Sequence, residues 1–176
     1  MSEDLTIQVI LSSDIVDSSS RVFSDETRKN QLIERDLATF RAGISSWEGE
    51  LIKNTGNGIL ATFSGSIQAL DFIKDFLVNL SKDSSPALQY RFGLHVVEIS
   101  CKNDGIIGLG VHLAARLQTI SPVNGVAFTQ VTHANLDPRF RSLATPIGNI
   151  RLEGVSEEIV CFGITEDAFL GRPAKT

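Results

Sequence analysis

Residues Leu51–Phe63 read L-I-K-N-T-G-N-G-I-L-A-T-F, a pattern typical of a β-hairpin. Two strand-like segments, Glu50–Lys53 and Gly58–Phe63, flank the polar residues Asn54–Asn57. Glycine, present at positions 56 and 58, adopts tight-turn conformations that other residues resist, and Asn-Gly between apolar runs is a strong hairpin signal. The stretch therefore predicts two antiparallel strands joined by a tight polar turn.

A second informative stretch is Ile10–Ser20, I-L-S-S-D-I-V-D-S-S-S, where an apolar run stops at Asp14 and gives way to small polar residues. Leu5–Val16 is rich in Ile, Val and Leu, which predicts a buried strand. A carboxylate at a strand end suits a hard cation, and the N–H groups of Val16–Ser20 offer a nest for phosphates. Asp and Ser are also common in ordinary strand-end turns, so the local pattern alone leaves both interpretations open.

The remaining chain alternates helix and strand patterns. Apolar residues recur at three- and four-residue spacing after Asp25, which indicates a helix start and one apolar helical face. The predicted elements are helices over 27–46, 66–82 and 108–120, strands over 88–99 and 125–129, and a closing hairpin from Leu152 and Val155–Ile164. This order predicts an α+β fold, a ferredoxin-like split βαβ sheet with helices on one face. We expect a single domain over 1–176, with a core of about 5–165 and a tail of 166–176.

Composition narrows the class of protein. The net charge is −5, the chain is 42% hydrophobic, and Lys and Arg form no stripe, which argues against nucleic acid as a partner. No apolar run approaches the ~18 residues of a membrane span, and the acidic start M-S-E-D-L has no signal-peptide pattern, so we expect a cytoplasmic protein with no membrane partner. Cys101 and Cys161 are then expected to be structural thiols, and His95 and His133 to be structural as well.

Four motifs in order resemble those of class III nucleotidyl cyclases, the adenylyl and guanylyl cyclase superfamily. Residues 14–19, D-I-V-D-S-S, resemble D-I-V-G-S-T, and residues 53–58, K-N-T-G-N-G, resemble K-T-x-G-D-G. Residues 91–99, R-F-G-L-H-V-V-E-I, resemble R-x-G-x-H-x-G-E-V, and residues 108–117, G-L-G-V-H-L-A-A-R-L, resemble G-x-x-V-N-x-A-A-R-L. The resemblance runs from about Ile7 to Ile164 and implies the cyclase homology domain.

The resemblance implies a site for two Mg²⁺ or Mn²⁺ ions at the first two motifs. Asp14 matches the ligand of both ions, and Ile15 matches the residue that offers its backbone carbonyl. Asn57 stands where the family has its second aspartate. An amide oxygen can ligate Mg²⁺ but cannot offset its charge, so this site should be weaker than a two-aspartate site.

The same motifs imply the substrate contacts. Lys53 matches the lysine that helps to read the base in purine cyclases. Ser18 and Ser19 lie in the phosphate-binding segment, and Asp17 replaces its usual glycine, which adds negative charge near the expected phosphates.

The later motifs imply the other half of the site. Arg116 matches the arginine that neutralises the transferring phosphoryl group. His112 stands where an asparagine normally orients the ribose, and an imidazole can donate one hydrogen bond there. The base-reading aspartate of adenylyl cyclases falls on Gly105, with Asp104 one position early, which argues against adenine.

The family works as dimers that share their sites, so the resemblance implies a head-to-tail homodimer. It also implies conversion of a nucleoside triphosphate to the 3′,5′-cyclic nucleotide and pyrophosphate. Because the base-reading aspartate is missing at Gly105, the chain resembles the pyrimidine cyclases of antiphage signalling, which implies UTP, or CTP, as substrate and a separate cyclic-nucleotide effector protein.

Two alternatives stay open. One is a catalytically inactive homologue, natural or through Asn57, that binds a nucleotide or dimerises as a regulatory module. The other is an adenylate cyclase that reads its base through Asp104 and Lys53.

Overall fold

The computed structural model describes residues 6–16, 25–82, 87–99, 104–151 and 156–173, the side chains of 99 and 104–107 excepted. One seven-stranded sheet has the order β2-β3-β1-β4-β5-β7-β6. Its strands are β1 Thr6–Ile15, β2 Glu50–Asn54, β3 Ile59–Phe63, β4 Tyr90–Ile99, β5 Val126–Thr129, β6 Thr145–Arg151 and β7 Glu158–Ile164. The helices are α2 Glu26–Ser46, α3 Ser66–Ser81, α4 Asp104–Ile120, α5 Gln130–Ala134, α6 Pro138–Arg141 and α7 Glu166–Phe169.

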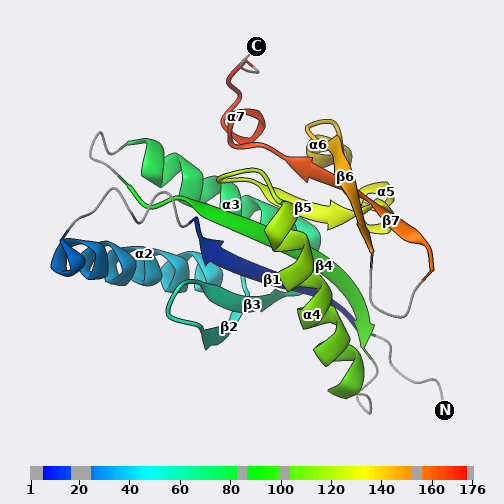
Figure 1. Ribbon diagram of the computed structural model, residues 1–176, viewed down its shortest axis with the longest axis horizontal. Helices are drawn as coiled ribbons and strands as arrows, with labels where there is room; N and C mark the ends of the chain where they lie inside the picture. Colours follow the sequence, from blue (N-terminus) through cyan, green and yellow to red (C-terminus); the bar gives the residue numbers. More distant parts are fainter. Residues whose placement is uncertain (1–5, 17–24, 83–86, 100–103, 152–155, 174–176) are drawn as a thin grey trace.

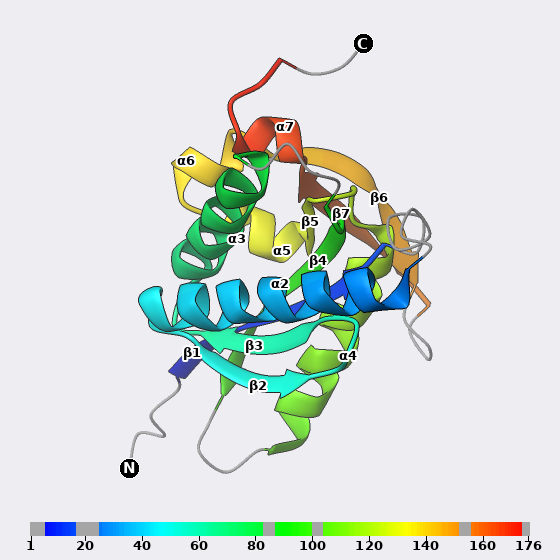
Figure 2. The same cartoon turned by 90° about the vertical axis from the view of Figure 1, so that its left-hand side faces the viewer.

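The first half of the chain has the predicted split βαβ topology. β1 lies between β3 and β4 and is antiparallel to both, and β2 continues the sheet as the hairpin partner of β3. β5 then pairs with β4 in parallel and begins the C-terminal addition. The views in Figure 1 and Figure 2 show β1 running through the middle of the sheet. The α+β fold class and the predicted hairpin are confirmed.

The expectation that the helices lie on one face of the sheet is wrong. Successive side chains of a strand point to opposite faces, and β1 is buried on both: Val9 and Leu11 belong to the cluster formed with α2 and α3. Ile10, between them, packs instead with Ala114 of α4. A strand that is apolar on both faces needs a cover on each, and Figure 2 shows α2 and α4 on opposite sides of the sheet.

Two local features determine how closely α4 packs on the sheet and where α2 begins. A Cβ atom at Gly93 of β4 would overlap the Ala114 carbonyl oxygen, so the backbone of α4 packs directly on the strand. On the other face, Asp25 accepts a hydrogen bond from the Thr27 N–H at 2.9 Å and caps α2, as the sequence predicts. The core beneath α2 and α3 is largely aromatic, with Phe40 at its centre.

The C-terminal part differs most from the sequence-based expectation. The first strand of the closing hairpin is β6, which ends at Arg151, and Leu152 lies outside the described residues. β6 is an edge strand with Pro146, Gly148 and a register shift between them, so its sequence gives only a weak strand signal.

The one-turn helices α5, α6 and α7 are too short to show a helical period, and the sequence did not predict them. α7 also changes the expected tail, because Phe169 is only 3% exposed and belongs to the main core. α4 begins at Asp104, four residues before the expected start. Within the described ranges, no helix has both the length and the apolar content needed to cross a bilayer.

Candidate active site

The β2–β3 turn is locked against the end of β1. The Ile15 N–H donates to the Asn57 carbonyl oxygen at 2.8 Å, and the Ile59 N–H donates to Ser13 Oγ at 3.1 Å. A Cβ atom at Gly58 would overlap the Ser13 carbonyl, so only glycine allows this close approach. The structure therefore brings Asn57 beside Asp14 and Ile15, the three predicted metal-site positions.

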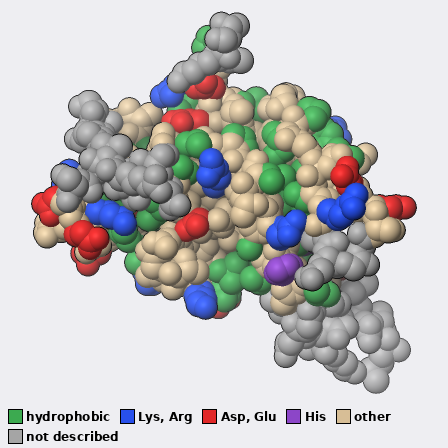
Figure 3. All heavy atoms as spheres, in the orientation of Figure 1, with side chains coloured by type: hydrophobic (Ala, Val, Ile, Leu, Met, Phe, Trp, Pro, Cys, Tyr) green, Lys and Arg blue, Asp and Glu red, His purple; other side chains and the backbone are tan. Residues whose placement is uncertain are grey.

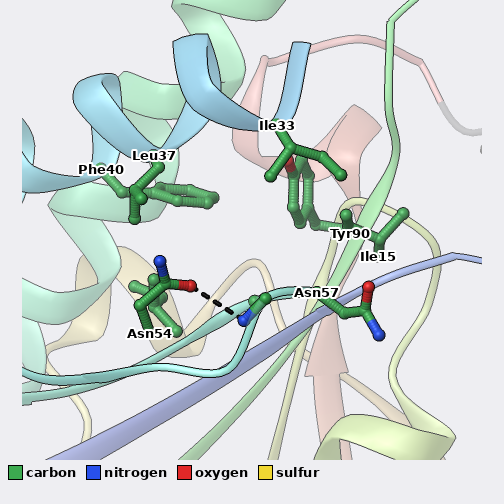
Figure 4. Close-up of a pocket in the computed structure, with 10 residues that line it drawn as sticks. Ile15, Ile33, Leu37, Phe40, Asn54, Asn57 and Tyr90 are labelled. Atoms are coloured by element: carbon green, nitrogen blue, oxygen red, sulfur yellow. Dashed lines mark hydrogen bonds between the residues drawn. The ribbon is translucent and has the colours of Figure 1, made fainter. Parts of the chain in front are cut away.

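Further hydrogen bonds fix the backbone inside the turn. Asn54 Oδ1 accepts from the Gly56 N–H at 2.9 Å, and the Thr55 N–H donates to the Gly58 carbonyl at 3.0 Å. Gly56 has φ of +88°, a left-handed conformation that favours glycine. The Asn57 side chain is exposed, and Figure 4 shows it pointing away from the pocket behind the turn. This leaves its amide facing solvent next to the end of β1.

The small pocket behind the turn is lined by apolar side chains of α2 and by Tyr90. The Tyr90 hydroxyl donates to Asp36 Oδ2 at 2.8 Å, and Arg35 lies 3.2 Å from the other carboxylate oxygen. Burial raises the pKa of the Asp36 carboxyl, against the opposing effect of the Tyr90 and Arg35 hydrogen bonds. Burial, together with the neighbouring Asp36 charge, also raises the pKa of Tyr90. The hydrogen bond from Tyr90 to Asp36 connects α2 to the central strand β4 directly behind the turn.

Asp14 lies half-buried at the end of β1, where its Oδ1 accepts from the Ile15 N–H at 3.1 Å. Its cross-strand partner on β4 is Arg91, and paired residues of antiparallel strands project on the same face of a sheet. The Arg91 Nε donates to the Ser121 carbonyl at 3.0 Å, beyond the end of α4. Arg91 is the functional candidate that the sequence analysis missed, because only the register of β1 and β4 places it opposite Asp14.

The ligand types at this strand end fit a divalent cation. Asp14 offers a carboxylate and Asn57 an amide oxygen, and Mg²⁺ and Mn²⁺ prefer oxygen ligands. The charge is low, however, since among the described residues no group of three or more Asp, Glu, His or Cys side chains comes together. The residues thus fit a weakly held cation that keeps most of its water, or one bound together with phosphates.

His112 and Arg116 lie elsewhere on the molecule. They are exposed and one helical turn apart on α4. Arg116 Nη2 donates to the Arg151 carbonyl at 2.7 Å, at the end of β6. β6 is one edge of the sheet, and β2, next to the Asn57 turn, is the other. One chain therefore does not bring Arg116 toward the Asn57 turn.

The other predicted site residues are placed only in part. Lys53 is exposed at the end of β2, next to the turn. Asp104 and Gly105 form the first turn of α4, and the Asp104 side chain is outside the described part of the structure. Asp17, Ser18 and Ser19 lie outside the described residues altogether.

Three of the histidines and cysteines predicted to be structural are described, and each is packed against or buried among other residues. The His133 ring stacks on Phe162, with 3.9 Å between the ring centroids. His95 Nδ1 is buried and bonds to no described residue, and burial lowers the pKa of this imidazole, which favours its neutral form. Cys161 is a buried free thiol whose pKa is raised by burial, and Cys101 is outside the described residues.

On the molecular face seen in Figure 3, Lys and Arg side chains are interspersed with acidic and uncharged ones. Where they are described on this face, the basic side chains form separate spots rather than one continuous band.

This fold is that of the class III nucleotidyl cyclase catalytic domain. The chain is similar to an adenylate/guanylate cyclase/hydrolase from Silicibacter pomeroyi, with a TM-score of 0.72 and 24% identity over 92% of this chain and 98% of that one. It is also similar to an adenylate cyclase from Trypanosoma brucei, solved in its monomeric state, with a TM-score of 0.73 and 15% identity over 96% and 92% of the two chains.

A curated relative, "Putative adenylate cyclase 3" of Rhizobium meliloti (strain 1021), is 24% identical over 133 residues, or 72% of this chain. The match spans only 23% of that relative's length. No family model matches the chain. The resemblance seen in the sequence motifs is thus confirmed at the level of the fold.

Proposed function

We propose that this chain is a nucleotidyl cyclase that converts a nucleoside triphosphate to the 3′,5′-cyclic nucleotide and pyrophosphate. The observation that carries the proposal is the locked contact between the β2–β3 turn and the end of β1. It sets Asn57 against Ile15 and Asp14 through one hydrogen bond and one position that only glycine can occupy.

The residues at and beside the end of β1 bind different parts of the cation–triphosphate complex. Asp14 holds the divalent cation through its carboxylate, and Asn57 contributes a neutral oxygen. The cation supplies Lewis-acid activation and charge neutralisation when it is bound. Arg91, cross-strand from Asp14, adds a fixed positive charge beside the phosphates, anchored by its hydrogen bond to Ser121. A guanidinium is suited to this role because it stays charged and donates in two directions.

The second half of the site comes from another copy of the chain. Arg116 stabilises the charge of the phosphoryl group and His112 donates to the ribose, but both lie on the outward face of α4. A head-to-tail homodimer would bring the α4 face of one protomer to the Asp14 edge of its partner. Leu109 of α4, 73% exposed, provides apolar area for that contact.

For the base, we propose UTP, or CTP as the next choice. Gly105 offers no carboxylate to accept a hydrogen bond from the adenine amine, and Lys53 is free to contact a pyrimidine carbonyl from its exposed position. The product would act on a separate effector protein in antiphage defence, in the cytoplasm, where triphosphates are available. This finer assignment rests on the sequence motifs.

Each of the two alternative functions is favoured by one observation. The name of the curated relative favours ATP as substrate, with Asp104 and Lys53 reading the base. The single carboxylate among the described residues at the cation site favours an inactive nucleotide-binding or dimerising module.

A product assay decides among them. The purified chain and its Arg116→Ala and Asp14→Ala variants are incubated with Mn²⁺ and each of ATP, GTP, CTP and UTP, and cyclic products are identified by mass spectrometry. We expect a cyclic pyrimidine from the unmodified chain and none from either variant. Mixing the two inactive variants should restore part of the activity, because one of the two shared sites is then intact. No product under any condition would contradict the proposal, and cyclic AMP alone would assign the chain to the adenylate alternative.

A further inference from the structure

The Asn57–Gly58 bond combines the features that allow an asparagine to deamidate. The Asn57 amide is exposed and makes no hydrogen bond to any described residue. The Gly58 N–H, the group that would attack this amide, donates to no acceptor in the described part of the chain. Gly58 also carries no side chain to hinder the approach of its own nitrogen to the Asn57 side chain.

We propose that Asn57 is a site of spontaneous modification, where loss of the amide creates an aspartate beside Asp14 and completes a two-carboxylate cation site. The Gly58 nitrogen loses its proton and forms a bond to the side-chain carbonyl carbon of Asn57. The bond from that carbon to the amide nitrogen breaks, and ammonia leaves. Water then opens the cyclic imide, giving aspartate, or isoaspartate when it attacks the main-chain carbonyl. Solvent supplies the water, and no oxidant or reductant is needed.

The position of the new carboxylate means that the modification changes the affinity of the site for a cation. The Asn57 carbonyl is bonded to the Ile15 N–H, and Gly58 packs on the Ser13 and Asp14 backbone, so residue 57 is held next to Asp14. A second anion beside Asp14 raises the affinity for Mg²⁺ or Mn²⁺, because two carboxylates neutralise the ion where one does not. The chain would thus gain cation affinity with age. This inference rests on the proposed function for its link to catalysis.

The chain contains its own control, a second Asn-Gly pair at Asn124–Gly125. Asn124 is 5% exposed, its Oδ1 accepts from the Tyr90 N–H at 2.9 Å, and its Nδ2 donates to Glu166 at 3.1 Å. The Gly125 N–H donates to the Pro122 carbonyl at 2.9 Å. Both reacting groups are occupied there, so we expect Asn124 to keep its amide while Asn57 loses it.

The test follows the full-length folded chain during incubation at mildly alkaline pH. Peptide mass spectrometry measures conversion of amide to acid at Asn57 and Asn124, with fragmentation that separates aspartate from isoaspartate. Mn²⁺ binding is measured on the same samples by electron paramagnetic resonance. The Asn57→Gln variant keeps an exposed amide but needs a larger ring to cyclise, and the Asn57→Asp variant represents the finished product.

We expect conversion at Asn57, none at Asn124, and Mn²⁺ binding that rises in proportion to the aspartate formed. Asn57→Gln should stay unchanged, and Asn57→Asp should bind Mn²⁺ from the start. The proposal is overturned if Asn57 keeps its amide in the folded chain while the urea-unfolded chain deamidates, or if conversion to aspartate leaves Mn²⁺ binding unchanged. A cyclase assay on Asn57→Asp separates the two proposals: strong Mn²⁺ binding without any cyclic product would overturn the proposed function alone.

Discussion

The two Asn-Gly pairs of this chain have the same chemistry and opposite surroundings. Asn124 is buried and hydrogen-bonded at its main chain and at both side-chain ends, and it joins β4, the loop before β5 and α7. Asn57 is held only by its main chain and presents its amide to solvent at the end of β1. The Asn124 pair therefore connects elements of the fold, whereas the Asn57 pair leaves its side-chain amide accessible to react.

The largest expected effect comes from the exposed pair. Replacing Asn57 by aspartate should raise cyclase turnover with Mn²⁺ by roughly 100-fold, because even outer partners of a metal site are typically worth about 10–100-fold. The unfolding free energy should change by less than ~0.5 kcal/mol, as for other exposed sites. Steady-state kinetics and urea unfolding measure the two quantities. A turnover equal to that of the unmodified chain would show that the second carboxylate has no role.

The same substitution at the buried pair should act on stability instead. Asn124→Asp removes the N–H donor to Glu166 and places two carboxylates against each other, 3.1 Å apart in the present geometry. We expect a loss of about 2–3 kcal/mol in unfolding free energy at neutral pH, since a buried polar group loses its partner. Urea unfolding measures the loss, and adding Glu166→Gln should recover part of it. An unchanged midpoint would mean that Asn124 does not join these elements.

A third substitution asks how rigid the exposed turn is. Gly56→Ala puts a side chain on a residue with φ of +88°, where no atom lies within 4 Å of the new Cβ. The cost is then conformational only, about 1 kcal/mol, with a matching decrease in the urea midpoint. A loss well above this value would indicate that the turn tolerates no adjustment, and Mn²⁺ binding should then fall as well.

The sequence predicted the fold better than it predicted the site. β1, the hairpin and the helices over 26–46 and 66–81 follow from apolar period and glycine position, which are local signals. The edge strand β6, with Pro146 and Gly148, gives no such signal, because neighbouring strands determine it. Asp14 and Asn57 were paired through resemblance to a family. Arg91 was missed because strand register is a property of the assembled sheet.

The smallest expected effect concerns Asp36, the hydrogen-bond partner of Tyr90, and Tyr90 links the surroundings of the two Asn-Gly pairs. The main-chain groups of Tyr90 bond Asn124, and its hydroxyl bonds Asp36 behind the Asn57 turn. Burial raises the pKa of the Asp36 carboxyl above its ordinary value, so between the two pKa values the folded state holds a proton that the unfolded state has released. The stability contribution of Asp36 is therefore present at acid pH and lost as the pH rises through the raised pKa.

The variant Asp36→Asn keeps an acceptor for the Tyr90 hydroxyl and carries no charge at any pH. Its unfolding free energy should match that of the unmodified chain at acid pH and exceed it at neutral pH, by less than the changes expected above. Urea unfolding at several pH values measures the difference. If the unmodified chain were instead the more stable of the two at neutral pH, the charged Asp36 and its bonds to Tyr90 and Arg35 would outweigh burial. Asp36 would then help to hold α2 over the Asn57 turn, as Asn124 helps to hold the loop before β5.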